Sequence, residues 1–222
     1  FFGLGAASKW IDIYAGVGLA VLLFMSLIRR YKEYMALRNS EDEAVRAAVA
    51  PFWKNTIKTL LWCCVFYIAI PVAIYLASYI PYVLSESHYD LEGIWGVQKF
   101  MLSYHGGLKA THPYQSPWWQ WPLIIRPMWY YVTYDVSEGY VGTISAMGLV
   151  VSVVIIGRLI RGRMKTDRIW MVLLIGLAAE YIPWVLVPRC TFIYHYFASV
   201  PFIILISVRA LMQKEQLDGR YK

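Results

Sequence analysis

One stretch of this sequence, HPYQSPWWQWPLIIRPMWYY at residues 112–131, surrounds a single cation with aromatic rings and prolines. The cation is Arg126, and leaving a guanidinium unpaired beside apolar residues is costly. Arg126 therefore needs a carboxylate or a phosphate, and its planar fork of N–H donors suits phosphate oxygens well. The stretch predicts a binding site for an anion.

A second arginine lies in a similar setting within VPRCTFIYHYFASVPF, residues 187–202. Arg189 occupies a very short connection between two apolar segments, and no surplus of acids accompanies either arginine. Two such cations suggest one anionic ligand held by Arg126 and Arg189. Glu180 is the main acid within an apolar segment; it either pairs with one arginine or lies in a cavity, and the sequence favours neither.

His195 and Tyr196 follow Arg189 closely and add groups that could hold or position a ligand. Helical spacing would place Thr191 and His195, at i and i+4, on one face. A histidine near the end of a membrane helix indicates function by default. A hydrogen-bonded histidine that only packs is the competing interpretation.

The rings of the first stretch have two possible uses. Trp118 and Trp119, together with Trp121, offer flat amphipathic faces that suit the headgroup zone of a membrane as anchors. The same faces could stack on a sugar ring or line a groove for an acyl chain, and His112 lies beside them.

Other chemistries find no support in the sequence. It contains no phosphate-binding Walker loop, no dinucleotide glycine motif and no nucleophile elbow. His105, His112 and His195 fit no zinc spacing, so we expect no metal. The cysteines form neither a disulfide framework nor a metal pattern, and we expect buried, inert thiols at Cys63, Cys64 and Cys190.

The composition shows what must position these residues. Hydrophobic residues make up 59% of the 222, charged residues only 16%, and the mean hydropathy is +0.48. This predicts an all-α membrane protein, a multi-helix transmembrane bundle. Five spans are expected, the second kinked at Pro71 and Pro81; they cover about residues 10–28, 57–84, 140–157, 169–187 and 192–212.

The distribution of charge gives an orientation. The net charge is +7, and sixteen of the 21 Lys and Arg lie in three segments, 29–58, 158–168 and 209–222. By the positive-inside rule these segments are cytoplasmic, so the basic charge is explained by membrane orientation and no nucleic-acid partner is expected. The loop 85–139 is then extracytoplasmic and far longer than a connection needs. An amphipathic helix is expected early in it, from about Leu91 to Gly107.

Three segments of the chain resemble a known family. The segments YHGGLKATHPYQSPWWQWPLIIRPMWYY and VPRCTFIYHYFASVPF, with GAASKW at residues 5–10, resemble the protein O-mannosyltransferase family, in its prokaryotic branch. The resemblance implies a membrane enzyme of the GT-C type with about eleven transmembrane helices. Such enzymes move mannose from a dolichyl- or polyprenyl-phosphate carrier to Ser or Thr of exported proteins, with inversion, on the outer or lumenal side.

The resemblance also implies how this chain relates to such an enzyme. Residues 1–222 would be its C-terminal transmembrane region, with no MIR domain in the loop 85–139. The acidic catalytic residue is expected upstream of Phe1, so the fragment would be inactive alone. The lipid-linked mannose is a substrate, and no cofactor is expected. The protein would lie in a bacterial plasma membrane, with its site on the extracytoplasmic face and an exported protein as acceptor.

Within this framework the candidate residues receive roles from their position and chemistry. The lipid phosphate and sugar would contact four of them, Arg126, Arg189, His195 and Tyr196. Three more would line the cleft, namely His112, Trp118 and Trp119. A related transferase for another lipid-linked sugar would look nearly the same. A non-enzymatic scaffold or a transporter fragment is the alternative, although no internal repeat of the transporter kind is visible.

Overall fold

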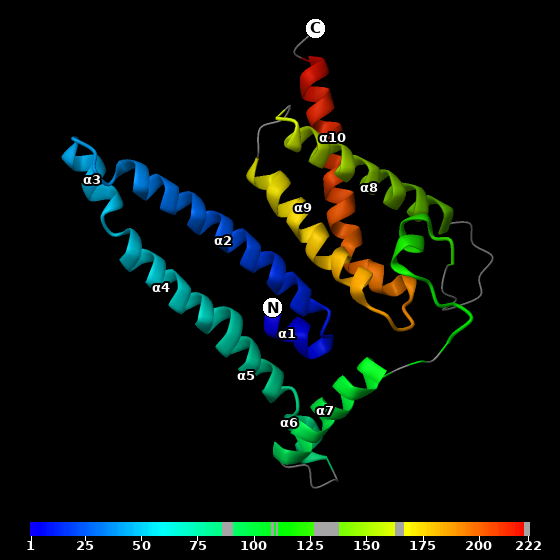
Figure 1. The fold of residues 1–222 in the computed structure, drawn as a ribbon. Helices are drawn as coiled ribbons and strands as arrows, with labels where there is room; N and C mark the ends of the chain where they lie inside the picture. Colours follow the sequence, from blue (N-terminus) through cyan, green and yellow to red (C-terminus); the bar gives the residue numbers. More distant parts are fainter. Residues whose placement is uncertain (86–90, 108, 110, 127–137, 163–166, 220–222) are drawn as a thin grey trace. The chain divides into compact units, whose positions relative to one another are not determined.

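The computed structural model describes residues 1–85, 91–107, 109, 111–126, 138–162 and 167–219; of residues 91, 138–146 and 213–219 it describes the backbone alone (Figure 1). These residues form helices and contain no strand. The chain divides into two compact units, Phe1–Phe100 and Met101–Lys222, which are described separately below.

The prediction of an all-α membrane protein is confirmed. Among the described residues, four helical stretches are long and apolar enough to cross a membrane: Asp12–Leu37, Glu43–Leu84, Arg168–Leu186 and Ile193–Met212. They match four of the five expected spans. The remaining one falls on α8 (Glu138–Ile160), whose side chains are described from Met147 onward; that described part, Met147–Ile160, is apolar.

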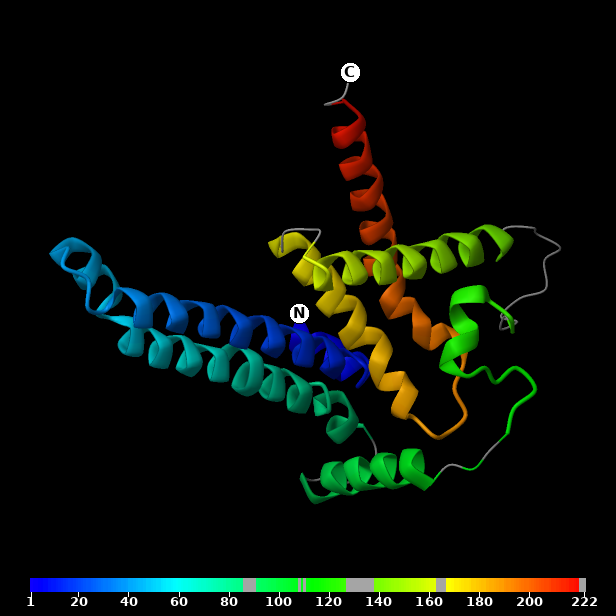
Figure 2. The same ribbon diagram turned by 45° about the horizontal axis from the view of Figure 1, so that its top comes forward.

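The first unit is built on a long antiparallel hairpin. Helix α2 (Asp12–Leu37) leads to the short helix α3 (Glu43–Val49), and α4 (Phe52–Cys64) returns beside α2, as Figures 1 and 2 both show. The Asp42 carboxylate caps α3 by accepting hydrogen bonds from the backbone N–H groups of Ala44 and Val45.

Two prolines shape the returning arm as expected. Because Pro71 has no N–H, the ladder loosens just before it into a π-helix, η1 (Val65–Ala69), which continues as α5 (Ile70–Ala77). A second break in the helix lies just before Ile80, where α6 (Ile80–Leu84) begins with Pro81 in its first turn. The structure thus has an irregularity in the helix at each proline, whereas a bend of the helix axis at Pro71 or Pro81 stays a prediction.

A polar network holds the other end of the hairpin. The Tyr75 hydroxyl accepts a hydrogen bond from the Trp10 indole N–H (3.0 Å) and donates to Gln98 Oε1 (2.6 Å). Gln98 Nε2 in turn donates to the Tyr79 hydroxyl (2.7 Å). Gln98 belongs to α7 (Leu91–Gly107), the amphipathic helix that the sequence predicted with these bounds.

Helix α1 (Phe2–Ser8) packs against α5 at very short range. A Cβ added at Gly3 would lie 2.8 Å from the Pro71 Cα, so only glycine permits this approach.

The second unit packs α10 (Val200–Gly219) against both α8 and α9 (Arg168–Tyr181). Its core contains Trp170, Ile203 and Ile206, each at most 1% exposed. Glycines make the crossings close: a Cβ at Gly148 on α8 would lie 2.0 Å from Ile203 Cγ2. Large side chains of α10 therefore fill space that α8 leaves open.

One end of α9 is fixed by a carboxylate with two functions. Asp167 caps α9 by accepting from the Ile169 N–H (2.9 Å) and forms an ion pair with Arg209 of α10. The Arg209 guanidinium also lies over the Trp170 ring, 5.2 Å from its centroid. These contacts join the start of α9 to the middle of α10.

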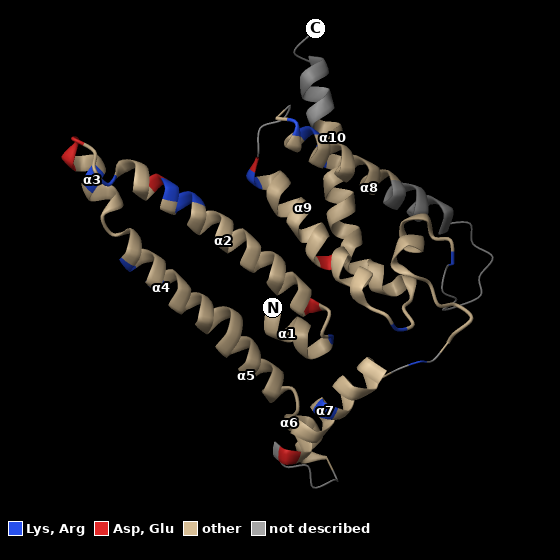
Figure 3. Ribbon diagram, viewed as in Figure 1, with Lys and Arg blue, Asp and Glu red and all other residues tan. Residues whose placement is uncertain are grey.

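The basic residues gather where the sequence placed them. Figure 3 shows Lys and Arg at the α3 end of the first hairpin and at the connection between α8 and α9. Both places belong to the segments that the positive-inside rule assigns to the cytoplasm.

The expected burial of the thiols is wrong. Cys64 is exposed on the surface of α4, and Cys63 and Cys190 are half-buried; all three are free. For Cys63 and Cys64 the reason is that the hairpin consists of only two packed helices, so α4 turns much of its apolar surface outward.

Candidate functional site

The two segments singled out in the sequence are joined directly in the second unit. The Ser116 N–H donates to the Thr191 carbonyl (2.9 Å), and the Thr191 hydroxyl donates back to the Ser116 carbonyl (2.9 Å). Both residues are buried, at 1% and 7% exposed. This reciprocal pair fixes the segment before Trp118 to the turn that follows Arg189.

Trp121 is the centre of the joined segments. It lies in a short 3-10 helix, η2 (Trp118–Leu123), and is completely buried. Its indole N–H donates to the carbonyl and the hydroxyl of Ser116, both at 3.0 Å. A buried indole needs such a partner, so the bond fixes the ring and the loop together.

Trp121 is surrounded by rings from three other segments. We call Trp118, Trp121, Tyr181, Trp184, His195 and Tyr196 the aromatic cluster. Trp184 comes from the 3-10 helix η3 (Ile182–Leu186) at the end of α9, and its ring centroid lies 5.6 Å from that of Trp121. His195 and Tyr196 come from η4 (Ile193–Ser199), each with its ring centroid 6.2 Å from that of Trp121. The cluster is a rigid support for the loops around it.

His195 is held on several sides. Its ring centroid lies 4.3 Å from that of Trp184 and 4.2 Å from that of Tyr194. Its Nδ1 lies 2.9 Å from the Phe192 carbonyl oxygen and 3.3 Å from the Phe192 backbone nitrogen, so the Phe192 backbone holds the ring whichever ring nitrogen carries the proton. The imidazole is 4% exposed, so its packing role is evident.

The helical relation expected between Thr191 and His195 is wrong. Thr191 lies in the extended turn before η4, and η4 itself is a 3-10 helix, so spacing of i and i+4 has no meaning there. The two residues nevertheless face the same segment, since Thr191 bonds Ser116 and His195 stacks on Trp121.

Tyr181 closes the cluster from the end of α9. Its hydroxyl donates to the Trp118 carbonyl (2.9 Å), and its ring centroid lies 5.5 Å from that of Tyr196. Glu180, the preceding residue, is 7% exposed on the same helix. Glu180, the acid singled out in the sequence, is therefore buried, and in the sequence it directly precedes a member of the aromatic cluster.

Arg126 follows an unusual turn. Ile124, the residue that follows η2 as its C-cap, has φ 49° and ψ 44°, a left-handed conformation that is rare and strained for a β-branched residue. This turn reverses the chain after Trp121 and Pro122, and Arg126 is exposed two residues later. Arg126 lies at most about 18 Å from Trp121, the reach of five residues.

Arg189 is half-buried in the turn between η3 and η4. Its Cα lies at most about 7 Å from that of Thr191, because two residues reach no further. Within the described part of the chain, neither Arg126 nor Arg189 forms an ion pair or a hydrogen bond through its guanidinium. Each of the two joined segments thus carries one arginine without a partner among the described residues.

The three residues expected to line a cleft have different environments. Trp118 is half-buried, with its ring centroid 6.1 Å from that of Tyr181. Trp119 points outward at 53% exposed, and His112 is exposed with its ring against Phe192, 5.2 Å between centroids. Trp119 and His112 therefore have faces available to a ligand.

No group of three metal-binding side chains occurs among the residues that the structure describes. His112 and His195 both contact Phe192, whereas His105 lies on α7 against Tyr104.

Sequence reasoning missed the residues that lock the loops, Ser116 and Tyr181, and the ring of Trp184. One signal was present: Trp118 and Trp121 are three residues apart, and a 3-10 helix places such residues on the same side. Both rings contact Tyr181, while Trp119 points away.

Comparison with known proteins agrees with the resemblance seen in the sequence. A family model described as the C-terminal four TMM region of protein-O-mannosyltransferase matches residues 90–213. This range includes the whole site and most of the second unit.

Curated relatives agree over nearly the full chain. A polyprenol-phosphate-mannose–protein mannosyltransferase of Mycobacterium tuberculosis (strain CDC 1551 / Oshkosh) is 23% identical over 241 residues, covering 91% of this chain and 43% of the relative. The protein of the same name from Mycolicibacterium smegmatis (strain ATCC 700084 / mc(2)155) is 25% identical over 244 residues, covering 91% and 44%. The chain therefore spans less than half the length of these relatives. No solved structure matches it.

Proposed function

Because this chain belongs to the protein O-mannosyltransferase family, we propose that it is the C-terminal membrane region of an enzyme that transfers mannose from a polyprenyl-phosphate carrier to Ser or Thr of exported proteins. The relatives named for polyprenol-phosphate-mannose support this choice of donor. The site would face outward from a bacterial plasma membrane, as the positive-inside rule suggests.

The chemistry of this transfer explains two cations without partners. The bond from the anomeric carbon to the phosphate oxygen breaks, and a new bond forms to the acceptor hydroxyl oxygen, whose proton passes to a base. The donor phosphodiester carries one negative charge, whereas the released polyprenyl phosphate gains a second. Arginines beside this phosphate bind the transition state more tightly than the donor, and so accelerate the reaction.

The observation that carries the proposal is the pair of uncompensated guanidiniums. Arg126 and Arg189 flank the loops joined by Ser116 and Thr191, and neither is neutralised by a carboxylate among the described residues. The aromatic cluster holds these loops in place before the donor arrives. Such preorganisation is what electrostatic catalysis requires.

The remaining candidates take supporting roles. His195 and Tyr196, both 4% exposed, position the loop that carries Arg189. Trp119 and His112 offer exposed rings that can stack on the mannose or the first isoprene units. We assign the base that accepts the hydroxyl proton to a carboxylate outside residues 1–222.

The test is a transfer assay. The full-length protein that contains this chain is placed in liposomes with labelled polyprenyl-phosphate mannose and a Ser/Thr-rich peptide, and the matched control peptide carries Ala at every Ser and Thr. Label should appear in the first peptide and not in the second. Absence of transfer together with uptake of a solute would overturn the proposal in favour of a transporter.

A further inference from the structure

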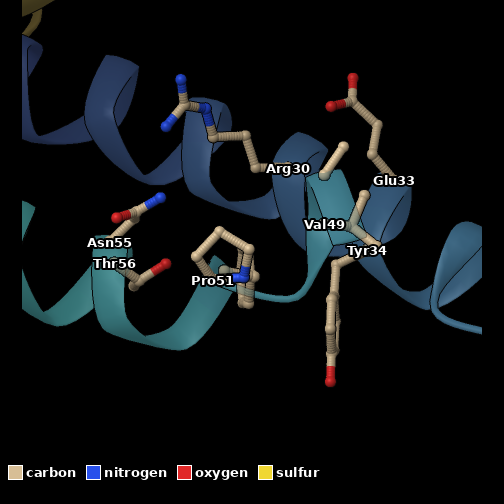
Figure 4. A pocket seen from close by; sticks show the side chains of 9 residues that line it. Arg30, Glu33, Tyr34, Val49, Pro51, Asn55 and Thr56 are labelled. Carbon is tan, nitrogen blue, oxygen red and sulfur yellow. The ribbon is translucent and has the colours of Figure 1, made fainter. Parts of the chain in front are cut away.

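A hollow with polar side chains on an otherwise apolar lining lies in the first unit, at the end of the hairpin opposite the Tyr75 network. It encloses about 230 Å³ between α2, α3 and the first turns of α4 (Figure 4). Its lining contains one basic, one acidic and two neutral polar side chains that concern us here, namely Arg30, Glu33, Asn55 and Thr56.

The acid of the hollow is already engaged elsewhere. Glu33 lies 3.4 Å from Arg29, one turn earlier on α2, and Figure 4 shows its carboxylate turned away from Asn55 and Thr56. Arg30 has no ion-pair or hydrogen-bond partner within the described residues. Arg29, Arg30 and Glu33 together therefore leave one positive charge at the edge of the hollow.

The three remaining polar groups suit a phosphate. In Figure 4 the Asn55 amide and the Thr56 hydroxyl project from α4, and the Arg30 side chain lies along α2 above them. Together they supply several N–H donors and one O–H donor, none of which is used within the described structure. Charge-assisted hydrogen bonds of this kind are the stronger ones in proteins.

The surroundings place the hollow at the level of lipid headgroups. A group of packed rings contains Tyr31, Tyr34, Phe52 and Trp53; Tyr34 and Phe52, with ring centroids 5.0 Å apart, line the hollow themselves. Aromatic residues of this kind mark a membrane interface, and the basic segment 29–58 marks its cytoplasmic side. Toward the apolar part of the hairpin, Ile28 and Ile57 are 55% and 56% exposed and can contact acyl chains.

We propose that this hollow binds the phosphate of an anionic glycerophospholipid of the cytoplasmic leaflet, with Arg30, Asn55 and Thr56 as its ligands. This goes beyond a general attraction of basic residues to the membrane, because it assigns one lipid to one place. It is independent of the mannosyl-transfer site, which lies in the other unit.

The experiment is native mass spectrometry of the chain, released from micelles that contain equal amounts of phosphatidylglycerol and phosphatidylcholine. The test variant is Arg30→Gln and the matched control is Arg38→Gln. Arg38 belongs to the same basic segment, 29–58, but does not line the hollow. We expect one phosphatidylglycerol to be retained by the wild type and by Arg38→Gln. Arg30→Gln should reduce its occupancy about tenfold or more.

Two further arms make the result decisive. The double variant Asn55→Ala, Thr56→Val keeps the charge and should still lose lipid severalfold; it serves also if Arg30→Gln fails to fold. Added inorganic phosphate should not displace the lipid, and if it does, the site is one for free phosphate. Equal loss in Arg30→Gln and Arg38→Gln, or equal retention of both lipids, would overturn the proposal.

Discussion

At the scale of single residues, Trp121 does more than any other ring of the site. It is fully buried, bonds Ser116 twice through one N–H, and touches rings of α9, η3 and η4. The sequence identified the stretch that contains it, but assigned the binding role to the neighbouring Trp118 and Trp119. Which of several adjacent tryptophans points inward depends on the 3-10 geometry of η2, and periodicity alone does not give that.

We predict that Trp121→Phe lowers the free energy of unfolding by about 1–2 kcal/mol, because the indole N–H bond is lost while most apolar contact remains. Trp121→Ala should cost about 3–5 kcal/mol, since it also leaves a cavity. Thermal unfolding in detergent measures both. Trp119→Phe is the control and should change little, as Trp119 is 53% exposed; an equal loss in the control would contradict the central role of Trp121 in the cluster.

For the two arginines, in contrast to Trp121, the sequence alone was enough to identify the residues. Their residue type and apolar surroundings were enough to single out Arg126 and Arg189, and the structure places both without carboxylate partners among the described residues. Ser116 and Thr191 could not be found this way, because small hydroxyl residues are common and their pairing across 75 positions is a tertiary fact.

At the scale of elements, close helix crossings depend on glycine. We predict that Gly148→Ala destabilises the second unit by about 1–3 kcal/mol, because the new Cβ would meet Ile203 Cγ2 at 2.0 Å. The matched control is Gly157→Ala on the same helix, where the nearest atom is the flexible end of Arg161 at 3.6 Å. That change should be neutral or stabilise by up to about 1 kcal/mol through helix propensity. Identical unfolding midpoints for the two variants would contradict the packing described.

The start of α9 allows the cap and the ion pair to be separated. Asp167→Asn keeps a capping oxygen and removes the charge, so we expect a loss below about 1 kcal/mol, as for a partly exposed pair. Asp167→Ala removes both contacts and should cost about 1 kcal/mol more. Denaturant titration of both variants measures the difference; no difference between them would show that the cap contributes nothing.

The elements themselves were largely predictable. Long apolar runs and the glycines at 106 and 107 give α7 with nearly the observed bounds, and they locate α2 and the returning arm. The expected end of the first span at residue 28 was too early, because α2 continues through the basic residues to Leu37. The short 3-10 helices were not foreseen, because their few residues carry no hydrophobic period and form where α9 and α10 must connect.

At the scale of the whole molecule, the charge pattern predicts a topology. In a background with Cys63, Cys64 and Cys190 replaced by Ala, the variant Ser40→Cys should react with a membrane-impermeant maleimide only in permeabilised cells, because residue 40 is expected on the cytoplasmic side. A cysteine at Thr111, an exposed residue of the long loop, should react from outside in intact cells. The reverse pattern would place the aromatic cluster on the wrong face for an exported acceptor.

The most direct test of the central claim is binding of polyprenyl phosphate, the released carrier, to the purified chain. Arg126→Gln and Arg189→Gln should each weaken binding about 10- to 100-fold, as expected for a charge-assisted contact to phosphate. Arg161→Gln, which removes the same charge from the connection between α8 and α9, should leave the affinity unchanged. If both site variants bind the carrier as tightly as the wild type while remaining folded, the two arginines do not hold the lipid phosphate.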